Sequence, residues 1–193
     1  MIRIEQDGRL RRITLASPET RNFLDEDGCQ RLFDEIRDGI ADTNTGAILL
    51  EAEGPVFCSG ARPAEGCDLF TIGRRMTKPL VISAQGVVIS GGVAILANAH
   101  VALAAQGTSF GITEMREHRW SVPIYEALAH AIGARRALEL GLTGRIFSTP
   151  DALTWGLIHQ AAPAFELADR ASDVAFALSQ ADANAVRDAF GSR

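Results

Sequence analysis

Apolar and polar residues alternate at the start of the chain, where Ile2 and Ile4 are separated by Arg3 and followed by Glu5. A period of two predicts a strand with one buried face. Residues 6–8 (QDG) read as the turn after it, and a second strand is predicted over 10–15, before an SPE turn. The chain is therefore expected to open with two strands.

The spacing of apolar residues then changes to that of a helix. Cys29, Leu32, Phe33, Ile36 and Ile40 recur on one face, which predicts a helix over 25–41.

Short and almost wholly apolar runs follow over 47–52 (AILLEA), 80–86 (LVISAQG) and 101–105 (VALAA), with a predicted helix over 93–99. Such runs suit a sheet that is buried on both faces. From residue 121 onward the pattern is helical, and SVP at 121 and STPD at 148 are typical helix starts. Strands alternate with helices first and helices dominate the end, so a single α/β domain is expected over residues 1–193.

Composition narrows the classes of function. Of the 193 residues, 47% are hydrophobic and 22% are charged, and the net charge of −5 argues against a basic nucleic-acid-binding surface. No apolar run is long and uncharged enough for a transmembrane or signal segment, so a cytoplasmic protein with no membrane partner is expected. The three cysteines, Cys29, Cys58 and Cys67, lack metal-ligand spacing and are expected to be reduced, and no metal site is expected.

Two glycine-containing segments offer backbone donors. In VVISGGVAIL (87–96), a helix that begins at the glycine pair leaves the Gly91 N–H free for an anion. In GPVFCSGARP (54–63), Gly60 allows a tight turn that presents the Ala61 N–H. Two such donors that converge on one oxygen form an oxyanion hole; a simple turn into a helix is the alternative.

The glycine pair matches neither a P-loop nor a dinucleotide-binding fingerprint. Ser90 also does not complete the G-x-S-x-G motif of a nucleophile elbow, because Val88 stands where the first glycine is required.

The order of AILLEAEGPVFCSGA, KPLVISAQGVVISGGVAIL, FGITEM and LTGRIFSTPDALTWGLIHQ resembles the crotonase family of enoyl-CoA hydratases and isomerases, over about residues 2–163. The resemblance implies a crotonase-like (ClpP/crotonase) α/β fold, with a spiral core of β-β-α units over 1–145 and a reduced helical part over 146–193. It implies an acyl-CoA thioester as substrate, whose enolate Ala61 and Gly91 stabilise through their N–H groups. Gly60, Gly92, Arg62 and Trp120 are expected to contact the substrate. Coenzyme A then arrives with the substrate, without a separate cofactor, and a homo-oligomer, trimer or hexamer, is expected.

The likeness also bears on the reaction. Hydratases of the family use two glutamates; the position of the first is Ala94 here, and the second is Glu114. Addition of water needs two acid–base groups, whereas movement of a double bond needs one base that takes a proton and returns it. The pattern therefore resembles that of the isomerases that convert 3-enoyl-CoA to 2-enoyl-CoA, with Glu114 as proton shuttle.

Other residues give alternatives. Glu117 and His118 follow Glu114 closely enough to share its face, and His118 is an alternative acid or base. Cys58 is an alternative nucleophile for thioester hydrolysis. Arg62 stands where many family members have Asp, and it is a candidate for a coenzyme A phosphate or a carboxylated acyl group. Trp120 is a candidate acyl-pocket residue, and packing is the expectation for Trp155.

Two departures from the family leave the reaction open. The segment between Ala61 and Lys78 is shorter than usual, and the chain ends soon after NAVRDAF (184–190), where typical members continue. Isomerisation, another crotonase-type reaction (hydration, thioester hydrolysis or decarboxylation) and acyl-CoA binding without catalysis therefore remain as hypotheses.

Overall fold

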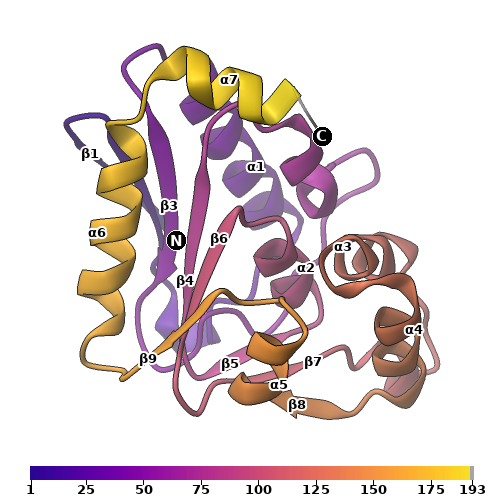
Figure 1. The fold of residues 1–193 in the computed structure, drawn as a ribbon. Coiled ribbons are helices and arrows are strands. Elements are labelled where there is room, and N and C mark those ends of the chain that lie inside the picture. The colour runs from indigo at the N-terminus through magenta and orange to yellow at the C-terminus, as the bar shows by residue number, and fades with distance from the viewer. Residues whose placement is uncertain (192–193) are drawn as a thin grey trace.

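A six-stranded sheet forms the centre of the computed structural model, which describes residues 1–191 (Figure 1). Its strand order is β1-β2-β3-β4-β6-β9; β1 is antiparallel to β2, and all other neighbours are parallel. The strands are β1 (Ile2–Asp7), β2 (Leu10–Leu15), β3 (Ala47–Ala52), β4 (Leu80–Ala84), β6 (Val101–Ala105) and β9 (Gln160–Ala162). The first two strands and the apolar strands predicted from the sequence are confirmed.

Both faces of this sheet are buried, as the apolar runs predicted. On β3, Ile48 and Leu50 pack into the core on the side of α1 (Glu26–Ala41), whereas Leu49 packs under α6 (Leu167–Ser179). In Figure 1, α6 covers one face, and α1 and α2 (Gly91–Ala97) cover the other. Successive residues of a strand point to opposite faces of the sheet. A strand that is covered on both sides is therefore apolar at every position and shows no alternation of apolar and polar residues.

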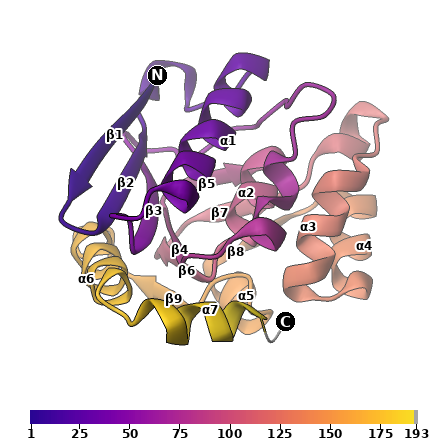
Figure 2. The same ribbon diagram turned by 90° about the horizontal axis from the view of Figure 1, so that it is seen from above.

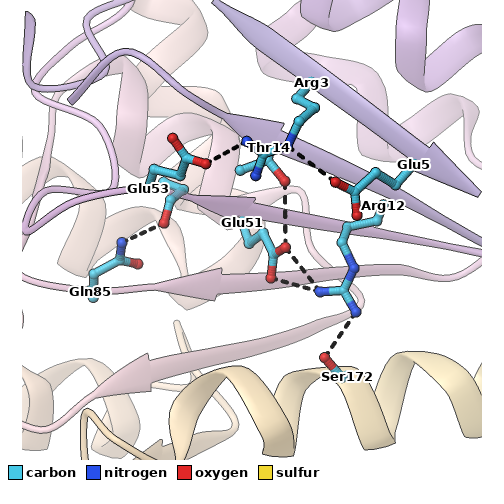
Figure 3. Close-up of polar contacts among 9 residues, drawn as sticks. Arg3, Glu5, Arg12, Thr14, Glu51, Glu53, Gln85 and Ser172 are labelled. Atoms are coloured by element: carbon cyan, nitrogen blue, oxygen red, sulfur yellow. Dashed lines mark hydrogen bonds and ion pairs between the residues drawn. The ribbon is translucent and has the colours of Figure 1, made fainter. Parts of the chain in front are cut away.

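A polar cluster attaches α6 to the sheet at its N-terminal strands (Figure 3). The Arg12 Nη1 donates to both carboxylate oxygens of Glu51 at 2.9 Å, and the Arg12 Nη2 donates to the Ser172 hydroxyl oxygen on α6 at 3.0 Å. Thr14 donates a longer bond of 3.4 Å to Glu51. One guanidinium therefore joins β2, β3 and α6.

A second, three-stranded sheet has the order β5-β7-β8. Its strands are β5 (Val87–Ile89), β7 (Ser109–Gly111) and β8 (Ile146–Ser148). Three residues are too few for a readable period, and these strands are not predicted by the sequence pattern. The sheet is nevertheless what sets the direction of the chain at the glycine pair, because β5 leads directly into α2.

Helices dominate the C-terminal part, as the sequence predicted, and two short strands, β8 and β9, lie among them. β8 extends the small sheet, and β9 completes the edge of the large one. The helices from residue 121 onward are α3 (Val122–Ile132), α4 (Ala134–Thr143), α5 (Thr149–Thr154), α6 and α7 (Ala183–Gly191). The STPD signature does start a helix, since Ser148 and Asp151 form a capping box on α5.

The shortened segment after Ala61 forms a 3-10 helix (Leu69–Arg75), whose Leu69, Phe70 and Ile72 are buried. Two further 3-10 turns lie at Pro18–Thr20 and Glu114–Glu117. Over the described residues, no helix combines the length and apolar character needed to cross a bilayer.

Candidate active site

A pocket of about 740 Å³ opens between the loop that follows Cys58, the end of β5, the 3-10 turn at Glu114 and the start of α3. In Figure 2, α2 lies between β5 and α3. Of the residues that the sequence singled out for chemistry, Gly60, Ala61, Arg62, Glu114 and Trp120 line the pocket. Gly91 and Gly92 do not line it.

The backbone of Ala61 is oriented by the chain segment in front of α1. Leu24 forms a parallel bridge with Ala61: the Leu24 N–H donates to the Gly60 oxygen at 3.0 Å, and the Arg62 N–H donates to the Leu24 oxygen at 2.9 Å. Peptide groups alternate in direction along an extended segment, so the Ala61 N–H points away from Leu24. It donates to no acceptor among residues 1–191.

Gly91 lies against Ala61 from the other side. A Cβ atom at position 91 would stand 2.7 Å from the Ala61 Cβ and 2.8 Å from the Ala61 nitrogen. The Gly91 N–H also has no acceptor within the described chain, because the first hydrogen bonds of α2 are donated by Val93 and Ala94 to Ser90. The two loops that the sequence could not show to meet are therefore in contact, with one free donor each.

Gly92 has a packing role instead. A Cβ atom there would lie 2.8 Å from the Cys58 oxygen and 3.0 Å from its Cβ. Glycine at this position lets the first turn of α2 approach the neighbouring segment, whose Cys58 N–H donates to Val87. Contact of Gly92 with the substrate stays a prediction from the sequence.

Ser90 has an unusual backbone conformation, with φ 54° and ψ −113°, at the turn between β5 and α2. Its hydroxyl donates to Glu114 Oε2 at 3.0 Å and lies 3.2 Å from the Thr113 hydroxyl. The Thr113 N–H donates back to the Ser90 hydroxyl oxygen at 3.3 Å. The Glu114 carboxylate is thus fixed next to Ser90, and the residue after Ser90 is Gly91, whose N–H is free.

Glu114 begins a 3-10 turn after β7, and the Arg119 N–H donates to its backbone oxygen at 3.0 Å. Parallel pairing of β7 with β5, and a bond from the Ser90 N–H to Gly111 at 2.7 Å, bring this turn to the glycine pair. Ala94, the position of the first hydratase glutamate, is fully buried and does not line the pocket. Glu114 is therefore the carboxylate that the structure holds beside Ser90 and Gly91.

Arg62 and Trp120 lie at the wall. The Arg62 guanidinium stands 5.5 Å from the centre of the Phe23 ring, which also lines the pocket, and it forms no ion pair with the described residues. Trp120 is 40% exposed and packs on Tyr125 with ring centres 5.5 Å apart. Gly60, at φ 152°, lies below Phe23, where a Cβ would approach the ring to 3.3 Å.

The residues that the sequence offered as alternatives for catalysis or binding differ in whether they line the pocket. Glu117 lines the pocket and pairs with Arg119. His118 ends the 3-10 turn in a left-handed conformation and is exposed, away from the lining. Trp155 is remote from the site and lies under Arg136, 4.5 Å from the ring centre.

Cys58 is fully buried, and burial raises the pKa of its thiol to about 12. A thiol with this pKa is almost wholly protonated at neutral pH and is not a reactive nucleophile. Cys67 lines the pocket, and burial raises the pKa of its thiol too.

Within residues 1–191, no three His, Cys, Asp or Glu side chains gather as a metal ion requires.

Sequence reasoning missed Ser90, Thr113 and Phe23 as members of this site. For Ser90 and Thr113 a signal was present, since each hydroxyl residue stands directly before a residue singled out for its role, Gly91 or Glu114. The hydrogen bonds between them depend on pairing of β5 with β7, which the pattern does not predict. For Phe23 no such signal exists.

Comparison with known proteins extends these observations. The family described as enoyl-CoA hydratase/isomerase matches residues 5–191. The chain is 27% identical over 193 residues to the mitochondrial enoyl-CoA hydratase domain-containing protein 3 of Xenopus laevis, covering 92% of this chain and 66% of that protein. It is 27% identical over 196 residues to a mevalonyl-coenzyme A hydratase of Aspergillus fumigatus, covering 91% of this chain and 71% of that protein. It thus spans about two thirds of the length of these relatives.

A similar result comes from solved structures. The crystal structure of an enoyl-CoA hydratase from Mycobacterium tuberculosis H37Rv superposes with a TM-score of 0.85 at 27% identity, covering 99% of this chain and 87% of that one. The six-stranded sheet, the small sheet and the helices described above therefore have the arrangement of that hydratase.

Proposed function

The chain belongs to the enoyl-CoA hydratase/isomerase family, and on that premise we propose that it binds an acyl-CoA thioester in the pocket and converts 3-enoyl-CoA to 2-enoyl-CoA. The supporting observation is the contact of Gly91 with Ala61, beside a carboxylate that Ser90 holds in place. Coenzyme A enters as part of the substrate, and the proposal includes no further cofactor.

The proposed reaction uses the two N–H groups and Glu114. The thioester oxygen accepts hydrogen bonds from Ala61 and Gly91, and Glu114 removes a proton from C2. Negative charge moves to the thioester oxygen, where preorganised donors stabilise it; loss of one such donor typically costs about 3 kcal/mol. Glu114 then returns the proton at C4, which leaves the double bond between C2 and C3. One carboxylate suffices because the proton is taken and given back.

Hydration is the second candidate, favoured by Glu117. This residue lines the same pocket three positions after Glu114, and the two curated relatives described above are named for hydratase chemistry. A second carboxylate in the pocket is what addition of water needs. Glu117 is mostly exposed and paired with Arg119, however, whereas Glu114 is held by Ser90, so isomerisation remains the first proposal.

The test supplies 3-enoyl-CoA and 2-enoyl-CoA separately and follows the absorbance of the conjugated thioester, with products separated by chromatography. Isomerisation predicts a gain of conjugation from the first substrate that Glu114→Gln lowers by ~100-fold or more, while Glu117→Gln has little effect. Hydration predicts a loss of conjugation from the second substrate that both variants reduce. Binding of acyl-CoA in calorimetry without either conversion contradicts both reactions and leaves a binding role.

A further inference from the structure

The backbone of Ser90 is in a conformation that L-residues rarely adopt, and it marks a sharp turn from strand to helix. β5 ends at Ile89 and α2 begins at Gly91, with Ser90 alone between them at φ 54°. Unfavourable backbone conformations of this kind persist where the surrounding structure enforces them, and they cluster at functional sites. Glycine would adopt the conformation without a Cβ penalty, so the serine needs another explanation.

We propose that Ser90 is a nucleophile and that the pocket hydrolyses acyl-CoA thioesters through an acyl-Ser90 ester. The proposal takes only its substrate class, acyl-CoA, from the proposed function, because it involves another bond of the substrate and needs no double bond. It differs from the interpretation of the sequence alone, in which Val88 leaves the G-x-S-x-G motif of a nucleophile elbow incomplete.

The geometry at Ser90 has the parts of such an elbow. In a nucleophile elbow the serine occupies a strained turn between strand and helix, and the oxyanion hole consists of the N–H of the next residue and an N–H from another loop. Here the next residue is Gly91, the other loop provides Ala61, and both N–H groups lack an acceptor within the described chain. The glycine two positions after the serine is Gly92, which lets the helix pack on Cys58.

The missing first glycine is explained by the packing. Val88 is fully buried in β5, pairs with Phe110 and bridges to Cys58. Its side chain therefore has a place in the core, and no neighbouring backbone requires a glycine there. The sequence therefore lacks the complete G-x-S-x-G motif, although the backbone at Ser90 forms the strand-to-helix turn that this motif normally produces.

The base for the serine is Glu114. The Ser90 hydroxyl already donates to Glu114 Oε2 at 3.0 Å, within the range at which a base takes a proton from a nucleophile. Both side chains line the pocket, whose described lining contains no histidine. A carboxylate is a weaker base than an imidazole, and a thioester suits it because its thiolate leaves more readily than an alkoxide or an amine.

The Ser90 oxygen attacks the thioester carbonyl as its proton passes to Glu114, and the negative charge moves to the carbonyl oxygen, which faces the Ala61 and Gly91 N–H groups. The carbonyl re-forms, the C–S bond breaks, and the coenzyme A sulfur takes the proton from Glu114. A water then gives a proton to Glu114 and attacks the ester; the C–O bond to Ser90 breaks and Ser90 regains the proton. The sum is thioester and water giving free acid and coenzyme A.

The experiment uses saturated acyl-CoA thioesters from acetyl- to decanoyl-CoA, which lack a double bond to move. Release of free coenzyme A is followed by chromatography for the wild type, Ser90→Ala, Ser90→Gly and Ser109→Ala. Ser109 is the matched control, since it lies on β7, which pairs with β5, and outside the lining of the pocket. Acid-quenched samples are analysed by intact mass and peptide mapping, and a fluorophosphonate probe reports an activated serine independently of the acyl chain.

We expect the wild type and Ser109→Ala to release coenzyme A, to carry one acyl group on Ser90 and to react with the probe. Both Ser90 variants lose release by ~100-fold or more and carry neither label. The glycine variant relieves the backbone, so its loss of release is not a folding defect. Absence of Ser90-dependent release overturns the proposal, whether or not 3-enoyl-CoA is isomerised. Isomerisation that persists without release sustains the proposed function alone, and release without isomerisation sustains the hydrolase alone.

Discussion

Gly91 and Ala61 approach so closely that a side chain on Gly91 has no room: its Cβ would lie 2.8 Å from both the nitrogen and the oxygen of Ala61. The contact is between two backbones, and flexible side chains cannot move aside to relieve it. The distance between the two free N–H groups is therefore set by the absence of a single carbon atom.

Gly91→Ala is expected to separate the two loops. Overpacking of a tight contact typically costs about 1–3 kcal/mol of the free energy of unfolding, and displacement of one oxyanion donor lowers the rate by ~100- to 1,000-fold. Urea unfolding and turnover of acyl-CoA measure the two effects. Gly191→Ala on α7, where a Cβ meets nothing within 4 Å, is the matched control. Unchanged turnover in Gly91→Ala contradicts the assignment of this donor.

The two variants of Ser90 separate backbone strain from the hydroxyl group. Both Ser90→Ala and Ser90→Gly lose the hydrogen bond to Glu114, but only alanine keeps a Cβ at φ 54°. The glycine variant is therefore expected to be more stable than the alanine variant by about 1–3 kcal/mol, measured by urea unfolding. Equal stability shows that the turn carries no strain.

The fold was largely predictable from the sequence, because its large strands are buried on both faces. Runs such as AILLEA have no alternative location in a domain of this size, and the face of α1 is visible from five apolar residues at helical spacing. The family likeness then gave the order of elements, which matches the hydratase structures. The small sheet was not predictable, since β5, β7 and β8 have three residues each.

In the candidate site, too, some residues were predictable from the sequence and others were not. Ala61, Gly91 and Glu114 are found by motif, because each belongs to a local segment with a recognisable pattern. The Ser90 contact with Glu114 joins residues 24 positions apart, and it depends on the parallel pairing of β5 with β7. Local pattern carries no information on that pairing. Likewise, the left-handed φ of Ser90 at the turn from β5 to α2 is a property of the backbone that the letters around it do not record.

Reactivity of the cysteines is expected to differ. Burial raises the pKa of Cys29 and Cys58 to about 12, whereas Cys67 lies at the wall of the pocket, partly exposed. A thiol reagent at pH 8 should therefore modify Cys67 in the folded protein and all three in denaturant. Mass mapping identifies the sites, and Cys67→Ser is the control. Fast native labelling of Cys58 contradicts the packing of this core.

The Arg12 cluster is expected to hold α6 on the sheet (Figure 3). The Arg12 and Glu51 side chains are only 21% and 19% exposed, so Arg12→Ala leaves a partly buried carboxylate short of partners, at a cost of about 1–3 kcal/mol. The matched control is Arg3→Ala, which removes an ion pair with Glu53 whose two side chains are 49% and 41% exposed; exposed pairs of this kind contribute little to stability. Urea unfolding measures both, and hydrogen exchange reports loss of protection in α6. Equal effects of the two variants contradict this role.

The capping box on α5 gives a dependence of stability on pH. The Ser148 N–H and hydroxyl both donate to Asp151 Oδ2, at 3.0 and 2.7 Å, and these bonds hold the pKa of the Asp151 carboxyl below its ordinary value. A carboxyl with a lowered folded-state pKa stabilises the fold above the unfolded value of about 3.9. That contribution disappears as the pH falls through the lower folded-state value.

Asp151→Ala is therefore expected to melt at a lower temperature than the wild type at pH 7 and pH 5, with the difference in Tm shrinking below about pH 4. The reason is that the wild type loses the charged acceptor of its capping box by protonation, while the variant has none to lose. Calorimetry at pH 7, 5 and 3 measures the difference. Asp169→Ala, in the first turn of α6, is the control for removal of a helix-start charge without a capping box. A difference in Tm for Asp151→Ala that stays constant down to pH 3 contradicts the hydrogen bonds at Ser148 as its source.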